Sequence, residues 1–206
     1  MTEKLVLHEY SPSGNCYKIR LVAAHLGAEL ERREYDILKG ETRTPVFLAR
    51  VNANGRIPVL QLGDRFIPES NAACFYLADG SDLIPADRFG RADMLRWMFF
   101  EQYSHEPNVA TLRYWLAYVG EAQLTDAQRM QLPGKSEAGY AALKLMDEHL
   151  ETHDFFVGGR LTLADIALYP YTNMAEEGGL HLAAFPNVRS WLERVASQPG
   201  HIKIAG

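Results

Sequence analysis

The sequence predicts two domains, a small α/β domain followed by an all-helical domain. Strand-like and helix-like patterns alternate through residues 1–80, and a loop-like stretch with Ser, Pro and two Asp residues occupies residues 81–87. Helical periodicity then dominates residues 88–206. Because strands are confined to the first part and helices to the second, we expect two separate layered units rather than one mixed sheet.

In the first domain, strands and helices are expected to alternate. Asn15 can cap a helix whose apolar positions recur with the helical period until Gly27 ends it. In chain order, the expected elements are a strand over 4–8, that helix, a strand over 29–36, a short helix around 43–51, strands over 57–62 and 66–68, and a helix over 69–79.

The second domain carries apolar stripes at helical spacing in residues 90–119, 135–152 and 188–196. A further helix is marked by its start, where Thr162 and Asp165 have the spacing of an N-capping box. A capping box stabilises the start of a helix by satisfying its first N–H groups.

Composition limits the classes of function. The 206 residues are 47% hydrophobic and 23% charged, which suits a globular protein with a sizeable core. A net charge of -5 lacks the basic balance of a nucleic-acid binder, and we see neither a signal peptide nor a membrane-length apolar run. Cys16 and Cys74 form no metal-binding or redox pair, so a cytoplasmic protein with free thiols and no metal is expected.

The turn SPSGNC, residues 11–16, places hydroxyl side chains just before a helix N-terminus. Helix N-termini carry unpaired N–H groups and a positive partial charge, so they favour an anion. A hydroxyl donor at this place can hydrogen-bond a bound thiolate. An ordinary N-capping turn explains the same residues when the turn is taken alone.

Two further features lie in the same domain. Pro58 can hold a cis bond that turns the backbone of Ile57 outward, toward a peptide-like ligand. Glu69 and Ser70 open a helix where N–H groups and a hydroxyl can hold a carboxylate, while Glu69 can hold an ammonium group. A strand-opening proline and an acidic first helical turn are the structural alternatives.

Together these segments resemble the soluble glutathione S-transferase superfamily, in its bacterial type, over essentially the whole chain. The resemblance is carried by SPSGNCYKIR, NANGRIPVL, IPESNAACFYLA, GRLTLAD and FPNVRSWLERVASQPG. It implies a thioredoxin-like first domain, a helical second domain, glutathione as co-substrate and a homodimer.

The resemblance also implies roles for single residues. The backbone of Ile57 would face the cysteinyl part of glutathione, Glu69 and Ser70 would hold its γ-glutamyl end, and Lys39 or Arg56 would take its glycine carboxylate. The candidate glutathione-binding residues are Ser11, Lys39, Arg56, Ile57, Pro58, Glu69 and Ser70.

The residue that activates the thiol is left open among several candidates. Ser13 best matches the catalytic serine of some members, whereas bacterial relatives with a GN-x-YK turn suggest Asn15. Ser11 and then Cys16 follow in our order, and Tyr10 lies near the catalytic tyrosine of a subgroup that the following SPSG does not fit.

One hydroxyl and one helix end are energetically sufficient for the activation. Lowering a thiol pKa by roughly two units requires about 2.7 kcal/mol. A hydrogen bond to a charged group contributes about 1.5–3 kcal/mol, and a helix N-terminus adds about 0.3–1 kcal/mol. Neither a metal nor a buried base is needed.

We expect the second substrate to bind between the domains, near the aromatic segment 97–115. Tyr103, His105 and Tyr114 are the candidate residues there, although most aromatic residues at helical spacing serve packing.

The sequence is consistent with three functions. The first is conjugation of glutathione to small electrophiles, and the second is a glutathione-dependent disulfide or peroxide reductase on the same fold. The third is a binding protein without turnover, because a fold does not fix a function.

Overall fold

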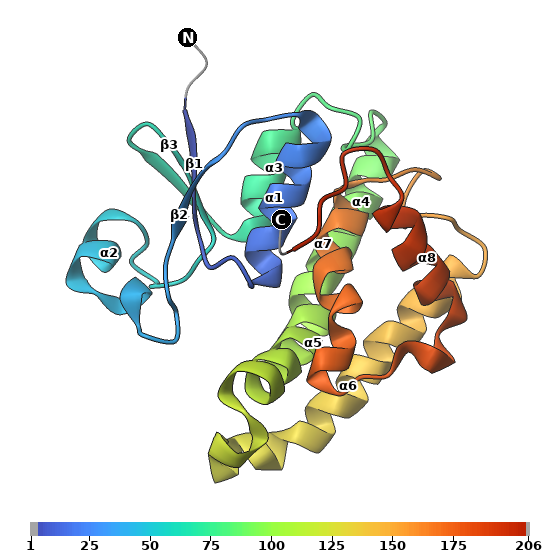
Figure 1. Cartoon of the computed structure of the whole chain (residues 1–206). Coiled ribbons are helices and arrows are strands. Elements are labelled where there is room, and N and C mark those ends of the chain that lie inside the picture. The colour runs from blue at the N-terminus through green and yellow to red at the C-terminus, as the bar shows by residue number, and fades with distance from the viewer. Residues whose placement is uncertain (1–3, 205–206) are drawn as a thin grey trace. The chain divides into compact units, whose positions relative to one another are not determined.

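The computed structural model describes residues 4–204. It divides into two compact units, one made of residues 4–84 and 199–204 and the other of residues 85–198. The first unit contains the sheet and the second is helical, as the sequence predicts (Figure 1).

The C-terminal tail, residues 199–204, differs from the prediction. The sequence pattern assigns all of 88–206 to the helical domain, but the structure places this tail with the first unit. The physical reason is a set of hydrogen bonds from Tyr17, Arg20 and His25 to carbonyl groups of the tail. Such side chain to backbone bonds leave no signal in the tail sequence.

The sheet of the first unit has the strand order β2-β1-β3-β4. β1 pairs with β2 in parallel, and the remaining neighbours pair in antiparallel fashion. The predicted strands are confirmed with bounds that differ by up to two residues at each end: β1 (Leu5–Glu9), β2 (Glu31–Glu34), β3 (Val59–Leu62) and β4 (Arg65–Pro68).

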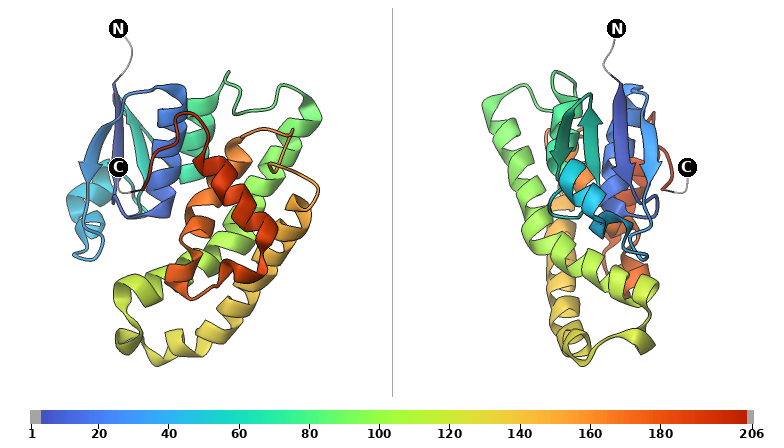
Figure 2. Two further views of the ribbon diagram at one scale, coloured as in Figure 1. Left: turned by 45° about the vertical axis from the view of Figure 1, so that its right-hand side comes forward. Right: turned by 90° about the vertical axis from the view of Figure 1, so that its left-hand side faces the viewer.

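Helices cover both faces of this sheet. α1 and α3 pack together on one face, and α2 lies on the other (Figure 2). Gly27 ends α1 in the left-handed region with φ 63°, as its position after the apolar pattern predicts. The helices are α1 (Gly14–Leu26), α2 (Pro45–Arg50), α3 (Ser70–Ala78) and the short 3₁₀ helix Glu41–Arg43.

The second unit is built around α7 (Leu163–Asn173), which contacts α4, α5 and α8. The other helices are α4 (Arg88–Phe100), α5 (Glu106–Arg113), α6 (Asp126–Leu150) and α8 (Pro186–Ala196), with short 3₁₀ helices Glu121–Gln123, Ala175–Gly178 and Leu182–Ala184.

The predicted helical stretch 90–119 contains two widened, π-helical turns, Glu101–His105 and Tyr114–Val119. The first turn ends two residues before Pro107, which has no N–H to donate to the preceding turn. The proline therefore accounts for the widening there. No helix within residues 4–204 has both the length and the apolar character to cross a bilayer.

The predicted capping box opens α7. The N–H and hydroxyl of Thr162 donate to one carboxylate oxygen of Asp165 over 2.9 and 3.0 Å. The other oxygen accepts from Phe156 N–H at 3.1 Å and from the Trp191 indole at 3.0 Å. Asp165 therefore joins the start of α7 to the preceding loop and to α8.

Candidate functional site

The sequence pattern predicts Asn15 as the cap of α1, but the cap is Ser13, because the helix begins one residue after Ser13 and Asn15 already lies in its first turn. The Ser13 hydroxyl keeps a hydrogen available for a ligand. Its hydroxyl oxygen accepts from the N–H of Cys16 at 3.4 Å, and its own N–H donates to the carbonyl of Tyr10 at 2.8 Å. Within residues 4–204 its hydroxyl hydrogen has no acceptor. The side chain is half-buried, so a ligand can reach a donor whose direction is already constrained by the cap.

The helix end itself adds to this donor. The first turn of α1 contains no acidic residue to offset the positive end of the helix dipole. A thiolate beside Ser13 would therefore meet both a hydroxyl donor and a favourable field.

Asn15 and Ser70 join the first turns of α1 and α3. The Ser70 hydroxyl donates to the Asn15 Oδ1 over 3.3 Å, and Ser70 is only 5% exposed. The two N-termini therefore converge, and the hydrogen of the Ser70 hydroxyl points to Asn15, so this hydroxyl can donate to a ligand only after it turns away from Asn15. Asn15 gains a role that the sequence does not reveal, that of orienting Ser70.

Glu69 precedes α3 in an unusual conformation. Its φ of 70° is the single positive value at a non-glycine residue within 4–204. Such backbone strain in a residue with a side chain costs roughly 1–3 kcal/mol and concentrates at ligand sites. The carboxylate is exposed and makes no capping bond, so it is free for a cation of a ligand.

The Ile57–Pro58 peptide is cis, as considered from the sequence. Pro58 is buried and Ile57 is half-buried just before β3. Among the described residues, the backbone groups of Ile57 make no hydrogen bond to other backbone groups. They remain able to pair with an extended ligand.

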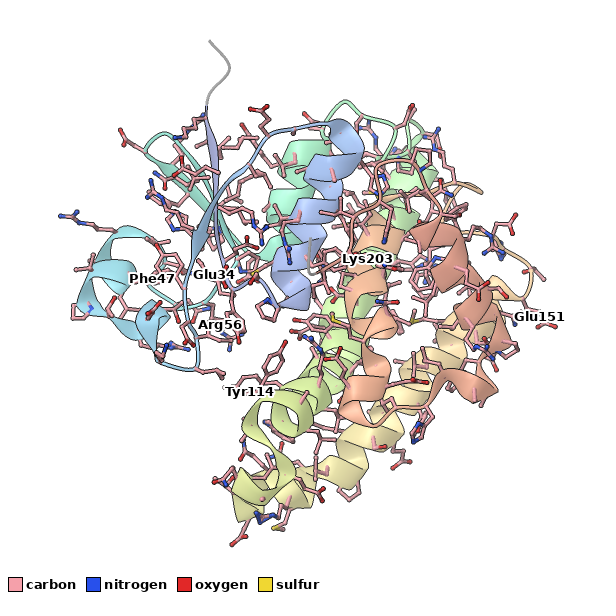
Figure 3. The ribbon with its side chains drawn as sticks, in the orientation of Figure 1. Glu34, Phe47, Arg56, Tyr114, Glu151 and Lys203 are labelled. Atoms are coloured by element: carbon pink, nitrogen blue, oxygen red, sulfur yellow. The ribbon has the colours of Figure 1, made fainter. Side chains whose placement is uncertain are left out.

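The two candidate cations differ in their surroundings. Lys39 pairs with Asp36 at 3.0 Å, and this hydrogen bond raises the pKa of Lys39. Arg56 is exposed, and its guanidinium makes no ion pair within the described part of the chain. Arg56 lies with Glu34 at the end of the sheet from which α1 begins (Figure 3). The geometry therefore favours Arg56 over Lys39 for a ligand carboxylate.

Ser11 is held by a residue that the sequence analysis missed. Its N–H and hydroxyl donate to the Glu34 carboxylate over 2.7 and 3.1 Å. This bonding ties the turn to the end of β2 and commits the Ser11 hydroxyl. No local signal marks Glu34, because the contact depends on the parallel pairing of β1 with β2.

Cys16 is buried, and burial raises the pKa of its thiol to about 12. Its sulfur accepts from the N–H of Tyr10 at 3.5 Å. A protonated, buried thiol is a poor nucleophile, so the residue serves packing.

The three candidates for the second substrate belong to the second unit. Tyr103 is 87% exposed and Tyr114 is 39% exposed. His105 is fully buried, with its Nε2 2.9 Å from the hydroxyl of Thr172. This environment suits a packing role for His105 and leaves the two tyrosines at the surface.

No cluster of three or more His, Cys, Asp or Glu side chains suited to a metal ion occurs in the described range 4–204. The donors gathered around Ser13 and Ser70 are hydroxyls and N–H groups, which suit an anionic organic ligand.

Similarity to known proteins is extensive. A crystal structure of a possible glutathione S-transferase from Rhodopseudomonas palustris has 46% identity and a TM-score of 0.92, covering 97% of both chains. A glutathione S-transferase from Pseudomonas fluorescens has 41% identity and a TM-score of 0.93, covering 98% of this chain and 99% of that one. The transcriptional regulator URE2 of Saccharomyces cerevisiae is 26% identical over 97% of this chain and 66% of its own length.

Family models match both halves of the chain. The N-terminal domain of glutathione S-transferase matches residues 4–79, and its C-terminal domain matches residues 109–199. With the sheet order, the capping box and the converging helix ends described above, these matches show that the chain belongs to the glutathione S-transferase family.

Proposed function

We propose that this protein binds glutathione at the N-termini of α1 and α3 and activates its thiol for conjugation to small electrophiles. The observation that carries the proposal is the capped hydroxyl of Ser13, which lacks an acceptor for its hydrogen at a helix end without acidic residues.

Each end of the tripeptide has a matching partner. The γ-glutamyl carboxylate would lie at the Ser70 hydroxyl and the first N–H groups of α3, and its ammonium group at Glu69. The cysteinyl backbone would pair with Ile57 beside Pro58. The glycine carboxylate would bind Arg56, because Lys39 is already paired with Asp36.

In the reaction, the thiol releases its proton to solvent and the Ser13 hydroxyl donates to the resulting thiolate. The sulfur then forms a bond to an electrophilic carbon, and the leaving group departs with the electron pair of its bond, as halide in the case of an aryl halide. Stabilising the thiolate by about 2–3 kcal/mol lowers its pKa by roughly two units. That is within the range of one charged hydrogen bond and one helix end.

Several expectations remain part of this proposal. Tyr103 and Tyr114 would contribute to the second-substrate pocket, and the protein would act as a cytoplasmic homodimer. A glutathione-dependent reductase remains the enzymatic alternative, and it would depend on Asn15 more than on Ser13.

A binding protein without turnover is the second candidate, favoured by the similarity to the transcriptional regulator URE2. It would retain the contacts at Ser70 and Ile57 and show no thiol chemistry.

One experiment separates these functions. Purified protein is titrated with glutathione by calorimetry and then assayed with aryl halides, disulfides and hydroperoxides side by side. We expect binding and conjugation. Turnover of only disulfides or hydroperoxides would favour the reductase. Glutathione binding without turnover of any substrate would favour the binding protein. Absence of glutathione binding would contradict all three functions.

A further inference from the structure

Arg20 in α1 joins the turn before Ser13 to the C-terminal tail. Its side chain is 3% exposed. One guanidinium nitrogen donates to the carbonyl of Ser11 over 2.6 Å, and the other donates to the carbonyl of Ile204 over 2.8 Å. A single planar group therefore bridges two segments that are far apart in sequence.

A buried carboxylate forms an ion pair with this guanidinium. Glu9, the last residue of β1, is fully buried, and its Oε2 lies 3.2 Å from the Nε of Arg20. Its other oxygen pairs with Arg32. Moving Arg20 would weaken the compensation of a buried charge, which is strongly unfavourable. The two terminal nitrogens of the Arg20 guanidinium, which form a planar fork, therefore remain directed at the carbonyls of Ser11 and Ile204.

The tail is held along α1 at more than one place. The Tyr17 hydroxyl donates to the carbonyl of Ile202, and the Nδ1 of His25 donates to the carbonyl of Pro199 over 2.8 Å. With Arg20, three side chains of one helix bind backbone carbonyls of the tail. The tail thus supplies a fixed acceptor for the second arm of the Arg20 fork.

Ser11 is held from both directions. Arg20 binds its carbonyl, and Glu34 accepts from its N–H and hydroxyl. The next bond of the turn runs from the N–H of Ser13 to the carbonyl of Tyr10 at 2.8 Å. A shift of Ser11 would therefore move the backbone that carries the Ser13 hydroxyl.

From this geometry we propose that Arg20 is a positioning residue for Ser13, with the C-terminal tail as its second anchor. This inference rests on the proposed function, because the quantity that it controls is the pKa of the bound glutathione thiol. Arg20 touches neither the thiol nor the electrophile in this scheme.

Two variants test the inference independently. Arg20→Lys keeps a positive charge for Glu9, but one ammonium group cannot reproduce the planar fork to two carbonyls. Truncation after His201 leaves Arg20 intact and removes the carbonyls of Ile202 and Ile204. Arg32→Lys is the matched control, since it alters the other partner of Glu9 and leaves the fork in place.

The readout is the ultraviolet absorbance of bound thiolate as a function of pH, with the pH profile of conjugation beside it. For both test variants we expect the thiol pKa to rise by about one unit. This corresponds to a loss of about tenfold in rate at a pH below both pKa values, and little loss above them. The control should keep the wild-type profile.

A purely structural role would lower the thermal midpoint without moving the thiol pKa. Unchanged thiol titrations in Arg20→Lys and in the truncated protein would overturn the inference while leaving the proposed function intact. If Arg20→Lys does not fold, the truncated protein decides alone by the same criterion. Wild-type protein that binds no glutathione would overturn the proposed function, and the inference with it.

Discussion

Two buried carboxylates, Glu9 in the first unit and Asp165 in the second, differ in the kind of partner that they have. Both are fully buried. Glu9 is paired with the guanidinium groups of Arg20 and Arg32. Asp165 has only neutral donors, namely two backbone N–H groups, one hydroxyl and one indole. Burial raises the pKa of Asp165 to about 6.

The difference in partners determines whether a change at the carboxylate affects stability alone or also the turn that carries Ser13. Asp165 binds groups that lie within the core of its own unit, so its effect ends with stability. Arg20, which pairs with Glu9, also donates to the carbonyls of Ser11 and Ile204. A change near Glu9 is therefore transmitted to the turn that carries Ser13. Each neutral donor at Asp165 has a single hydrogen, which the carboxylate accepts. Arg20 has several N–H donors and can bind further acceptors besides Glu9.

The largest expected effect is a loss of stability when Asp165 is replaced. Asp165→Ala would leave three buried N–H donors, including the Trp191 indole, without an acceptor, and we expect a loss of about 4 kcal/mol in the free energy of unfolding. Denaturant unfolding measures it. Asp87→Ala is the control, because Asp87 caps α4 from an exposed position and should cost only about 1 kcal/mol. Equal losses in the two variants would contradict the role given to burial.

A smaller effect, on glutathione affinity, is expected at Ser70, where the N-termini of α1 and α3 meet. Ser70→Ala removes a hydroxyl that would turn from Asn15 to donate to the γ-glutamyl carboxylate. A charged hydrogen bond contributes about 1.5–3 kcal/mol, and because the bond to Asn15 is given up in exchange, we expect the Kd for glutathione to rise only about tenfold. Calorimetry gives the value. Ser81→Ala removes a hydroxyl that donates to the carbonyl of Ala78, beyond the other end of α3, and should leave the Kd unchanged. Unaltered affinity in Ser70→Ala would remove Ser70 from the site.

The next effect concerns the thiol itself. Ser13→Ala should raise the pKa of bound glutathione by about one unit, because the thiolate loses its hydroxyl donor. Thiolate absorbance measures the shift, and Ser13→Thr should restore the wild-type value.

Thr125→Ala provides the control for this variant. Thr125 caps α6 in the second unit, so its loss should lower stability by about 1 kcal/mol, as loss of the Ser13 cap also should, without changing the thiol pKa. If Asn15→Ala raised the thiol pKa and Ser13→Ala did not, activation would belong to Asn15.

The smallest effect is a pH dependence of the docked tail. Burial lowers the pKa of both His25 and His201 below the ordinary value of 6.5. The unfolded chain therefore takes up these protons first, and stability falls as the pH drops below about 6.5. The raised pKa of Asp165 has the opposite sign below about pH 6, so variants must be compared with wild type at each pH.

Unfolding curves at pH 7.5 and 5.5 measure this dependence. His201→Asn should flatten the decline relative to wild type, while the exposed His181→Asn should not alter it. An identical decline in all three proteins would show that the tail histidines do not titrate on unfolding.

Local sequence patterns were sufficient for the order of strands and helices in the first unit. The start of α3 and the box at Thr162 depend on residues within one or two turns, so spacing alone predicts them. The cap of α1 was predicted at Asn15 and lies at Ser13, because both residues are good caps and spacing does not decide between them. The contact of Asn15 with Ser70, the hold of Glu34 on Ser11 and the docking of the tail on Arg20 join segments 23 to 184 residues apart. Such contacts depend on strand pairing and helix packing, which one sequence does not display.

The central claim is that the glutathione sulfur is held as an anion by Ser13 at the start of α1. A crystal structure of the protein with bound glutathione tests it most directly. We predict that the sulfur lies within hydrogen-bond distance of the Ser13 hydroxyl, with the γ-glutamyl carboxylate at Ser70. Glutathione bound elsewhere, or with its sulfur turned away from Ser13, would contradict the account.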